Sequence, residues 1–173
     1  MATPVERHLV LVGLPGAGKS TVGKLVARRL ARAFVDLDDE IVRHSGMTVA
    51  ELFARQGESH FRQLEESATA RIPPSPVLVI APGGGWIANE RAVATLRARA
   101  SIIYLRVHPA TALARLKNDM TIRPLIAGAN PLETLDRLLD ARRLKYEAAN
   151  ATVDTDGLDA DEVALAIVRI AAG

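Results

Sequence analysis

The chemistry in this sequence begins with the stretch GLPGAGKST, which spans Gly13–Thr21. It matches the phosphate-binding pattern G-x-x-x-x-G-K-[ST], with Gly13, Gly18, Lys19 and Ser20 at the fixed positions. Glycines let the backbone N–H groups of such a loop approach phosphate, and the helix that follows favours an anion at its N-terminus. The pattern predicts that Lys19 bridges the β- and γ-phosphates of a nucleotide while Ser20 ligates Mg²⁺.

Two carboxylates, Asp36 and Asp38, end the apolar stretch AFVDLD. Since alternate residues of a strand point to the same face, the spacing predicts that both project toward the C-terminal edge of a parallel sheet, where ligands bind. One carboxylate there can hold the hydration shell of Mg²⁺, and the other can accept a hydrogen bond or proton from an attacking hydroxyl. The alternative is that acidic residues only cap the following helix, as we expect of Asp39 and Glu40.

Arg62 and Glu65 lie three residues apart in the stretch FRQLEE, which places both on one face of a helix. An ion pair between them would hold the guanidinium of Arg62 in position to bind a substrate carboxylate through two hydrogen bonds. On the residues alone, an ordinary surface ion pair is at least as well supported.

Three consecutive glycines, Gly83–Gly85, follow a later apolar run. Each glycine costs up to about 1 kcal/mol relative to alanine in an ordered structure. A plain turn seldom needs more than one of them. The triplet therefore predicts a close approach between this backbone and a ligand.

The segment from Lys117 to Pro131 holds Asn, Asp, Gly and Pro between two predicted helices. A long irregular connection in a compact domain is either disordered or functional, and a mobile lid is the functional option. Arg123 at its middle favours a lid, because a lid arginine can neutralise charge that develops on a transferred phosphoryl group. Arg142, in the helix beyond, is on spacing alone an ordinary solvated residue.

Apolar runs alternate with amphipathic stretches along the chain, and this alternation favours an α/β fold in which a parallel sheet has helices on both faces. The runs show little polar alternation, as expected of strands that are buried on both sides. Strands are predicted over His8–Gly13, Ala33–Asp38, Val77–Ala81, Ser101–Val107 and Ala151–Val153. Helices are predicted over Lys19–Ala31, Thr48–Ala54, Glu58–Arg71, Asn89–Ala98, Pro109–Lys117, Pro131–Ala149 and Asp159–Ala171, with N-caps at Thr48 and Asn89.

The composition limits the possible classes of protein. With 173 residues, 49% of them hydrophobic, the chain is expected to form one domain over 1–173. Nucleic-acid-binding proteins typically have clustered cations and interleaved aromatic residues, and the net charge of +2 and the 3% aromatic content do not indicate this class. The lack of cysteine excludes disulfides and thiolate chemistry. No apolar stretch has the length of a signal peptide core or a membrane span, so we expect a soluble, cytoplasmic protein. We also expect it to be a monomer.

Taken in order, these motifs resemble those of the shikimate kinase family. The resemblance runs nearly end to end, through LVGLPGAGKSTVGK, DLDDEI, MTVAELFARQGESHFRQLEE, GGG, IRPL, ARRLKY and VDT. It implies a P-loop NTPase of the nucleoside-monophosphate-kinase type with a five-stranded parallel sheet, a substrate-binding region near 48–71 and a lid near 117–130. It also implies Mg²⁺- and ATP-dependent phosphorylation of the 3-hydroxyl of shikimate, a step toward chorismate and the aromatic amino acids.

The resemblance implies roles for individual residues around the nucleotide. It implies that the cradle for the ATP phosphates consists of Gly16, Ala17, Gly18, Lys19, Ser20 and Thr21. It places Asp36 at the hydration shell of the Mg²⁺ that Ser20 ligates. Arg123 matches the lid arginine that reaches the ATP phosphates and, with Lys19, neutralises their charge. Arg115 lies one residue out of register with the arginine that stacks on adenine.

On the acceptor side, the resemblance concerns four residues. Asp38 matches the residue that holds the substrate hydroxyls and can act as a base, aiming the hydroxyl in line with the phosphoryl group. Arg62 and Arg142 match the two arginines that bind the substrate carboxylate. Gly84 matches a backbone contact to the substrate.

Two other functions stay open on the sequence. A related small-molecule kinase could act on another polyol acid such as gluconate, because Trp86 follows the glycines where the family has a smaller residue. A ligand sensor of the same fold could bind without turnover. The sensor is less well supported, since no helix-turn-helix segment precedes Val5 and since Lys19, Asp36 and Asp38 are all present.

Overall fold

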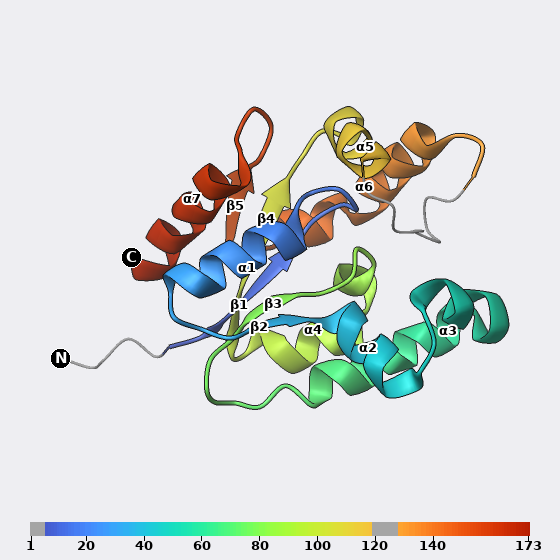
Figure 1. Cartoon of the computed structure of the whole chain (residues 1–173), viewed down its shortest axis with the longest axis horizontal. Coiled ribbons are helices and arrows are strands. Elements are labelled where there is room, and N and C mark those ends of the chain that lie inside the picture. Colours follow the sequence, from blue (N-terminus) through green and yellow to red (C-terminus); the bar gives the residue numbers. More distant parts are fainter. Residues whose placement is uncertain (1–5, 119–127) are drawn as a thin grey trace.

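A single parallel sheet runs through the part of the chain that the computed structural model describes, residues 6–118 and 128–173. Its strand order within these residues is β2-β3-β1-β4-β5 (Figure 1). The strands are β1 His8–Val12, β2 Phe34–Asp36, β3 Val79–Ala81, β4 Ala100–Arg106 and β5 Ala151–Asp154. Each end of these strands lies within two residues of the end that the sequence predicts.

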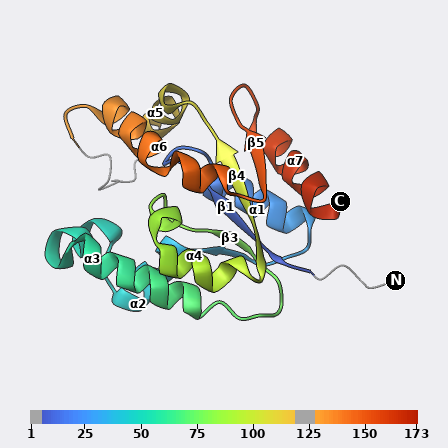
Figure 2. The same ribbon diagram turned by 180° about the vertical axis from the view of Figure 1, so that it is seen from behind.

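Helices cover both faces of the sheet, as the sequence predicts. They are α1 Lys19–Arg29, α2 Leu37–Ser45, α3 Val49–Ala70, α4 Glu90–Arg97, α5 Pro109–Lys117, α6 Pro131–Glu147 and α7 Ala160–Ala172, with a short 3₁₀ helix, η1, at Trp86–Ala88. Helices α1 and α7 pack side by side on one face (Figure 1). Helices α4 and α6 lie on the other face (Figure 2). No helix in the two described ranges is both long and apolar enough to cross a membrane.

The core is centred on β1, in which every residue is buried. This strand pairs with β4 along its whole length, from His8 beside Ala100 to Val12 beside Tyr104. On its other side it pairs with β3, with Leu9 beside Val79. A strand in this position has a packed helix layer on either face, which explains why its sequence is a continuous apolar run.

The strand order places the candidate chemistry at one edge of the sheet. The chain runs from β1 outward to β2, returns to β3, and then crosses to β4 on the other side of β1. Because all five strands in the described residues are parallel, the segments that follow β1, β2 and β3 open at the same carboxyl edge. In open α/β sheets this reversal of direction is where ligands bind.

The structure corrects the predicted environment of Asp36 and Asp38. Strand β2 ends at Asp36, and α2 begins at the next residue, so Asp38 lies in the first turn of a helix rather than on a strand. The reason is a cap: the Asp36 carboxylate accepts hydrogen bonds from the N–H groups of Asp38 and Asp39, at 3.0 and 3.2 Å. Leu37 is buried, so its apolar character fits a helix as well as a strand.

Two further predictions concern helix bounds and the lid. The helices predicted over Thr48–Ala54 and Glu58–Arg71 form one element, α3, with a break in helical backbone at Gly57, where φ is 81°. Thr48 and Asn89 are N-caps of α3 and α4, as predicted. Arg123 and most of the predicted lid, residues 119–127, lie outside the described residues.

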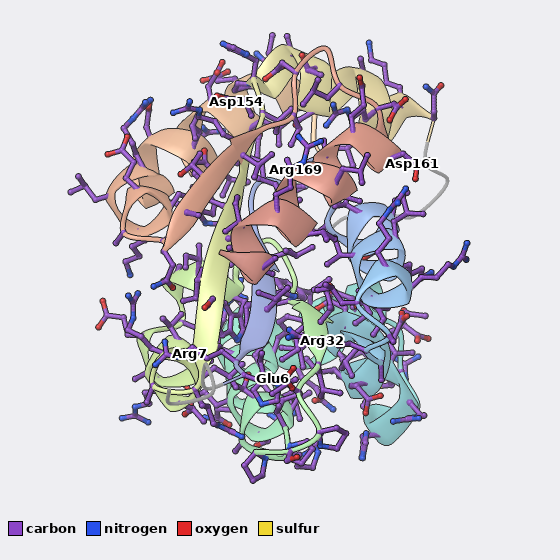
Figure 3. The ribbon with its side chains drawn as sticks, turned by 90° about the vertical axis from the view of Figure 1, so that its left-hand side faces the viewer. Glu6, Arg7, Arg32, Asp154, Asp161 and Arg169 are labelled. Carbon is purple, nitrogen blue, oxygen red and sulfur yellow. The ribbon has the colours of Figure 1, made fainter. Side chains whose placement is uncertain are left out.

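The end of the sheet opposite the carboxyl edge is closed by polar contacts. Figure 3 shows Glu6, Arg7 and Arg32 together at this end; Arg32 donates to the carbonyl of Arg7 at 3.1 Å. Elsewhere, Arg29 of α1 and Asp161, in the first turn of α7, form an ion pair at 2.9 Å. This ion pair joins the first and last helices.

Candidate active site

The loop after β1 has the geometry of an anion-binding site. Gly16 and Gly18 have φ of 86° and 90°, in the left-handed region that favours glycine. A Cβ on Gly16 would lie 2.5 Å from the carbonyl oxygen of Ala112. Gly18 precedes α1, whose N-terminus has neither a side-chain cap nor an acidic residue in its first turn. Its N–H groups and the helix dipole therefore favour phosphate at this position.

Lys19 lies over its own loop. Its Nζ donates to the carbonyl oxygens of Gly13 and Leu14, at 2.8 and 2.9 Å. These two contacts hold the ammonium beside the N-terminus of α1, where a positive charge can contact the terminal phosphates of a nucleotide.

Ser20 and Asp36, two residues that the sequence predicts for Mg²⁺, are in direct contact. The Ser20 hydroxyl donates to Oδ2 of Asp36 at 2.6 Å. The other oxygen of Asp36 accepts the two N–H groups that begin α2, so the carboxylate has a fixed orientation. Mg²⁺ prefers hard oxygen ligands, and the Ser20 hydroxyl and the Asp36 carboxylate both offer them. In such sites Mg²⁺ is bound by few protein groups, together with phosphate and water.

A cavity of about 620 Å³ extends from the phosphate loop between α1, α5 and α7. Arg115 lies in its wall and donates to the Thr155 hydroxyl at 3.1 Å, to the Thr155 carbonyl at 3.0 Å and to the Gly16 carbonyl at 3.4 Å. The wall also contains residues that the sequence analysis missed, namely Thr155, Leu158, Asp159, Ala160 and Val163. The sequence could have indicated these residues, because the loop after the last parallel strand must open at the same edge of the sheet as the phosphate loop.

The three glycines after β3, called the glycine turn here, make room for side chains of the protein. A Cβ on Gly83 would lie 2.7 Å from Oδ1 of Asp38, and a Cβ on Gly85 would overlap the guanidinium of Arg62. A Cβ on Gly84 would lie 3.2 Å from Pro15 of the phosphate loop. None of the three has a left-handed backbone. The sequence predicted that a ligand approaches this backbone closely. In the structure, the groups that approach it are Asp38, Arg62 and the phosphate loop.

Arg62 is held in position by two carboxylates. Its Nη1 donates to Glu65 at 2.8 Å and its Nη2 to Glu58 at 3.0 Å. The predicted pair with Glu65 is confirmed, and it is not a surface pair, because the Glu65 side chain is only 1% exposed. Burial raises the pKa of the Glu65 carboxyl, while the charge and hydrogen bond of Arg62 and the hydrogen bond of Asn89 act in the opposite direction.

Arg142 reaches the glycine turn from α6. The residue is buried, with 6% exposure, and its Nη1 donates to the carbonyl of Gly84 at 2.7 Å. This corrects the reading from spacing alone, which makes Arg142 a solvated helix residue. Arg62 and Arg142 therefore approach adjacent glycines from two helices and give the turn two guanidinium groups.

Trp86 is directed into the core. Its side chain is fully buried, and its Nε1 donates to the Thr69 hydroxyl at 3.1 Å. A fully buried ring presents no surface to a ligand, so it does not reduce the space beside the glycine turn. The observation that kept a gluconate-type kinase open on the sequence is thereby removed.

The strand order, the phosphate loop and the cavity beside it define a P-loop kinase of the nucleoside-monophosphate-kinase type. A model of the shikimate kinase family matches residues 15–172. The chain belongs to the shikimate kinase family.

Individual relatives agree with this assignment over nearly their whole length. The chain is 40% identical to a shikimate kinase of Thermodesulfovibrio yellowstonii, with 94% of this chain and 94% of the relative covered. It is 44% identical to one of Saccharopolyspora erythraea, with 92% and 91% covered. The structure is similar to shikimate kinase from Acinetobacter baumannii in complex with shikimate, with a TM-score of 0.89, 35% identity, and 95% and 92% coverage.

A gluconokinase is a more distant neighbour. The structure from Sinorhizobium meliloti 1021 has a TM-score of 0.60 and 17% identity, with 98% of this chain and 96% of that chain covered. At that identity the likeness shows a shared fold alone.

Proposed function

We propose that this protein transfers the γ-phosphoryl group of ATP to the 3-hydroxyl of shikimate, giving shikimate 3-phosphate and ADP. The single observation that carries the proposal is the convergence of Arg62, Arg142 and Asp38 on the glycine turn, directly beside the phosphate loop. Two guanidinium groups fit a carboxylate, and a neighbouring carboxylate fits hydroxyls. The family and the shikimate complex of a relative support this choice of acceptor.

On the nucleotide side, the loop N–H groups and Lys19 bind and orient the phosphates. Ser20 and Asp36 would hold Mg²⁺, which supplies neutralisation of phosphate charge when it is bound with ATP. The cavity beyond Arg115 accommodates the nucleoside, and its wall includes Leu158 of the segment before α7. Arg123 is assigned, as a proposal, to the lid near 117–130.

On the acceptor side, Arg62 and Arg142 bind the carboxylate and fix the ring of the substrate, with Gly84 offering its backbone. Asp38 accepts the proton of the 3-hydroxyl while the hydroxyl oxygen forms a bond to the γ-phosphorus and the bond to the ADP oxygen breaks. The substrate-binding region near 48–71 corresponds largely to α3, which carries Arg62.

The proposal extends to organisation and partners. We assign 1–173 to one kinase domain that acts as a cytoplasmic monomer on two small molecules, without nucleic acid or membrane. The small net charge of +2 and the low aromatic content of 3% support the absence of a nucleic-acid partner.

Release of ADP measured over a panel of shikimate, quinate and gluconate tests the proposed function. We expect turnover with shikimate and little with the other two acids. Turnover of gluconate instead would favour the related polyol-acid kinase, and tight binding without turnover would favour the sensor. In crystals soaked with shikimate, the ligand should lie between Asp38, Arg62, Gly84 and Arg142; density elsewhere would contradict the proposal.

A further inference from the structure

Asn89 connects the glycine-turn region to the helix that carries Arg62. The residue is 7% exposed and lies between η1 and α4. Its Oδ1 accepts from the N–H of Ala92 at 3.4 Å, which caps α4. Its Nδ2 donates to the carbonyl of Arg62 at 3.0 Å and to Oε2 of Glu65 at 3.3 Å. One amide therefore links the start of α4 to the middle of α3.

The hydrogen bond to Glu65 has a specific electrostatic role. A buried carboxylate loses its hydration and needs donors in return. Arg62 and Asn89 both donate to Oε2 of Glu65, and the charge of Arg142 acts on the same carboxylate from α6. Burial raises the pKa of this carboxyl, and these three residues oppose the rise. Asn89 is the neutral member of the group, so it favours the charged carboxylate without adding a cation.

The orientation of the Arg62 guanidinium depends on Glu65. A free arginine side chain has about 2 kcal/mol of rotamer entropy, which binding would otherwise have to overcome. Of its two carboxylate partners, Glu58 is 59% exposed and Glu65 is 1% exposed. The exposed pair contributes little, so the buried pair fixes the guanidinium against Gly85.

We propose that Asn89 is a positioning residue for the acceptor site: its amide orients Glu65, and Glu65 in turn orients Arg62 toward the substrate carboxylate. The inference rests on the proposed function. Asn89 does not itself contact the substrate in this arrangement. An ordinary N-cap would account for the bond to Ala92 but not for the two hydrogen bonds to α3.

Two variants separate positioning from capping. Asn89→Ser keeps an oxygen that can cap α4 but lacks the amide donor, whereas Asn89→Ala lacks both. We expect each to raise the KM for shikimate about fivefold, with kcat and the KM for ATP unchanged. Asn89→Ala should lower Tm further than Asn89→Ser does, because it removes the cap of α4 as well as the amide donor. Glu90→Gln, at the exposed neighbouring position that pairs with Lys145, is the control and should leave both KM values unchanged.

A pH profile gives a readout that capping would not affect. Without the amide donor the pKa of Glu65 rises further, so the carboxylate is protonated more readily and its hold on Arg62 weakens. The rise in the KM for shikimate in Asn89→Ser should therefore grow as the pH falls below neutrality, relative to the unmodified protein.

The outcomes distinguish this inference from the proposed function. Shikimate turnover in the unmodified protein together with an unchanged KM in Asn89→Ser overturns the inference alone and leaves Asn89 as an N-cap. An equal rise in KM for ATP and shikimate also overturns it, because it indicates a general loss of structure. Absence of shikimate turnover in the unmodified protein overturns the proposed function and this inference with it.

Discussion

The phosphate loop and the glycine turn follow neighbouring strands, β1 and β3, and both are rich in glycine. In the phosphate loop, Gly16 has a positive φ, and an added Cβ would meet the backbone of Ala112. In the glycine turn, Gly85 has φ −89°, and an added Cβ would meet the movable end of the Arg62 side chain. In the phosphate loop, glycine is needed because the backbone adopts a positive φ. In the glycine turn, glycine is needed because a neighbouring side chain occupies the space of a Cβ.

The polar groups of the two regions also differ, because one region relies mainly on the backbone and the other on side chains. The phosphate side uses backbone N–H groups and one ammonium that bonds to its own loop. The proposed acceptor side has guanidinium groups from α3 and α6, which are held by a buried carboxylate and a backbone carbonyl. Changes in the first region should affect nucleotide binding and stability together. Changes in the second should affect the acceptor with little effect on stability.

Lys19→Ala tests the phosphate side and has the largest expected effect. Removal of a charge that stabilises the transferred phosphoryl group should lower kcat by about 10²- to 10³-fold in the ADP-release assay with shikimate. Lys24→Ala, at an exposed position of the same helix, is the matched control and should retain normal turnover. A kcat for Lys19→Ala close to that of the control would contradict the assigned role.

Arg62→Lys tests the acceptor side without removing the charge that pairs with Glu65. Lysine cannot present two parallel N–H groups to a carboxylate, so the KM for shikimate should rise about 10- to 100-fold. The KM for ATP should be unchanged. Arg55→Lys, at an exposed position of α3, should behave like the unmodified protein. Equal changes in the KM for ATP and for shikimate would argue against a carboxylate-binding role.

A pair of glycine substitutions compares the two regions directly. Gly85→Ala keeps an ordinary backbone conformation, so its loss of Tm should come only from displacement of Arg62 from Glu65 and should be smaller than that of Gly16→Ala, while the KM for shikimate rises about three- to tenfold. In Gly16→Ala, the loop would force alanine into a positive φ, which costs about 1–2 kcal/mol of stability. Tm should therefore fall, and the KM for ATP should rise. The opposite pattern of Tm and KM would show that the two glycines have been assigned the wrong roles.

His8, at the end of the sheet away from both regions, has the smallest expected effect. The side chain is fully buried and its Nδ1 accepts from the N–H of Leu78 at 3.0 Å. Burial and the charge of Arg99 lower its pKa from the ordinary value of 6.5. Below that value the unfolded chain binds more protons than the folded one, so the free energy of unfolding should decrease as the pH falls.

Urea unfolding at neutral and mildly acidic pH measures this change. His8→Asn keeps an acceptor for Leu78 but does not titrate, so its free energy of unfolding should depend less on pH. The KM values for ATP and shikimate at neutral pH should not change, because the residue begins β1 rather than following it. Equal acid sensitivity in both proteins would assign the loss to other groups.

The phosphate side could be predicted from the sequence because its parts are contiguous. The loop, the preceding strand and the following helix occupy one short stretch, and the motif fixes their order. The strands could be predicted because buried parallel strands are continuous apolar runs. Asp38 was placed on the wrong element, since Leu37 is buried in a helix as it would be in a strand.

The acceptor side could be predicted only in part, because its parts come together from distant segments. The pair of Arg62 and Glu65 is local to one helix and was predicted. Neither the burial of Glu65 nor that of Arg142 can be obtained from spacing, because each depends on which helix packs over the glycine turn. Asn89 was predicted as a cap, but its bonds to α3 depend on the packing of α3 against α4.

The burial of Trp86 has a practical consequence. It is the single tryptophan of the chain, it follows Gly85 directly, and its indole is anchored to Thr69 on the helix that carries Arg62. Fluorescence excited selectively from indole therefore comes from one buried side chain, which directly follows the glycine turn. We therefore expect a fluorescence titration with shikimate to report binding at the glycine turn without an added label, through the contact of Trp86 with α3.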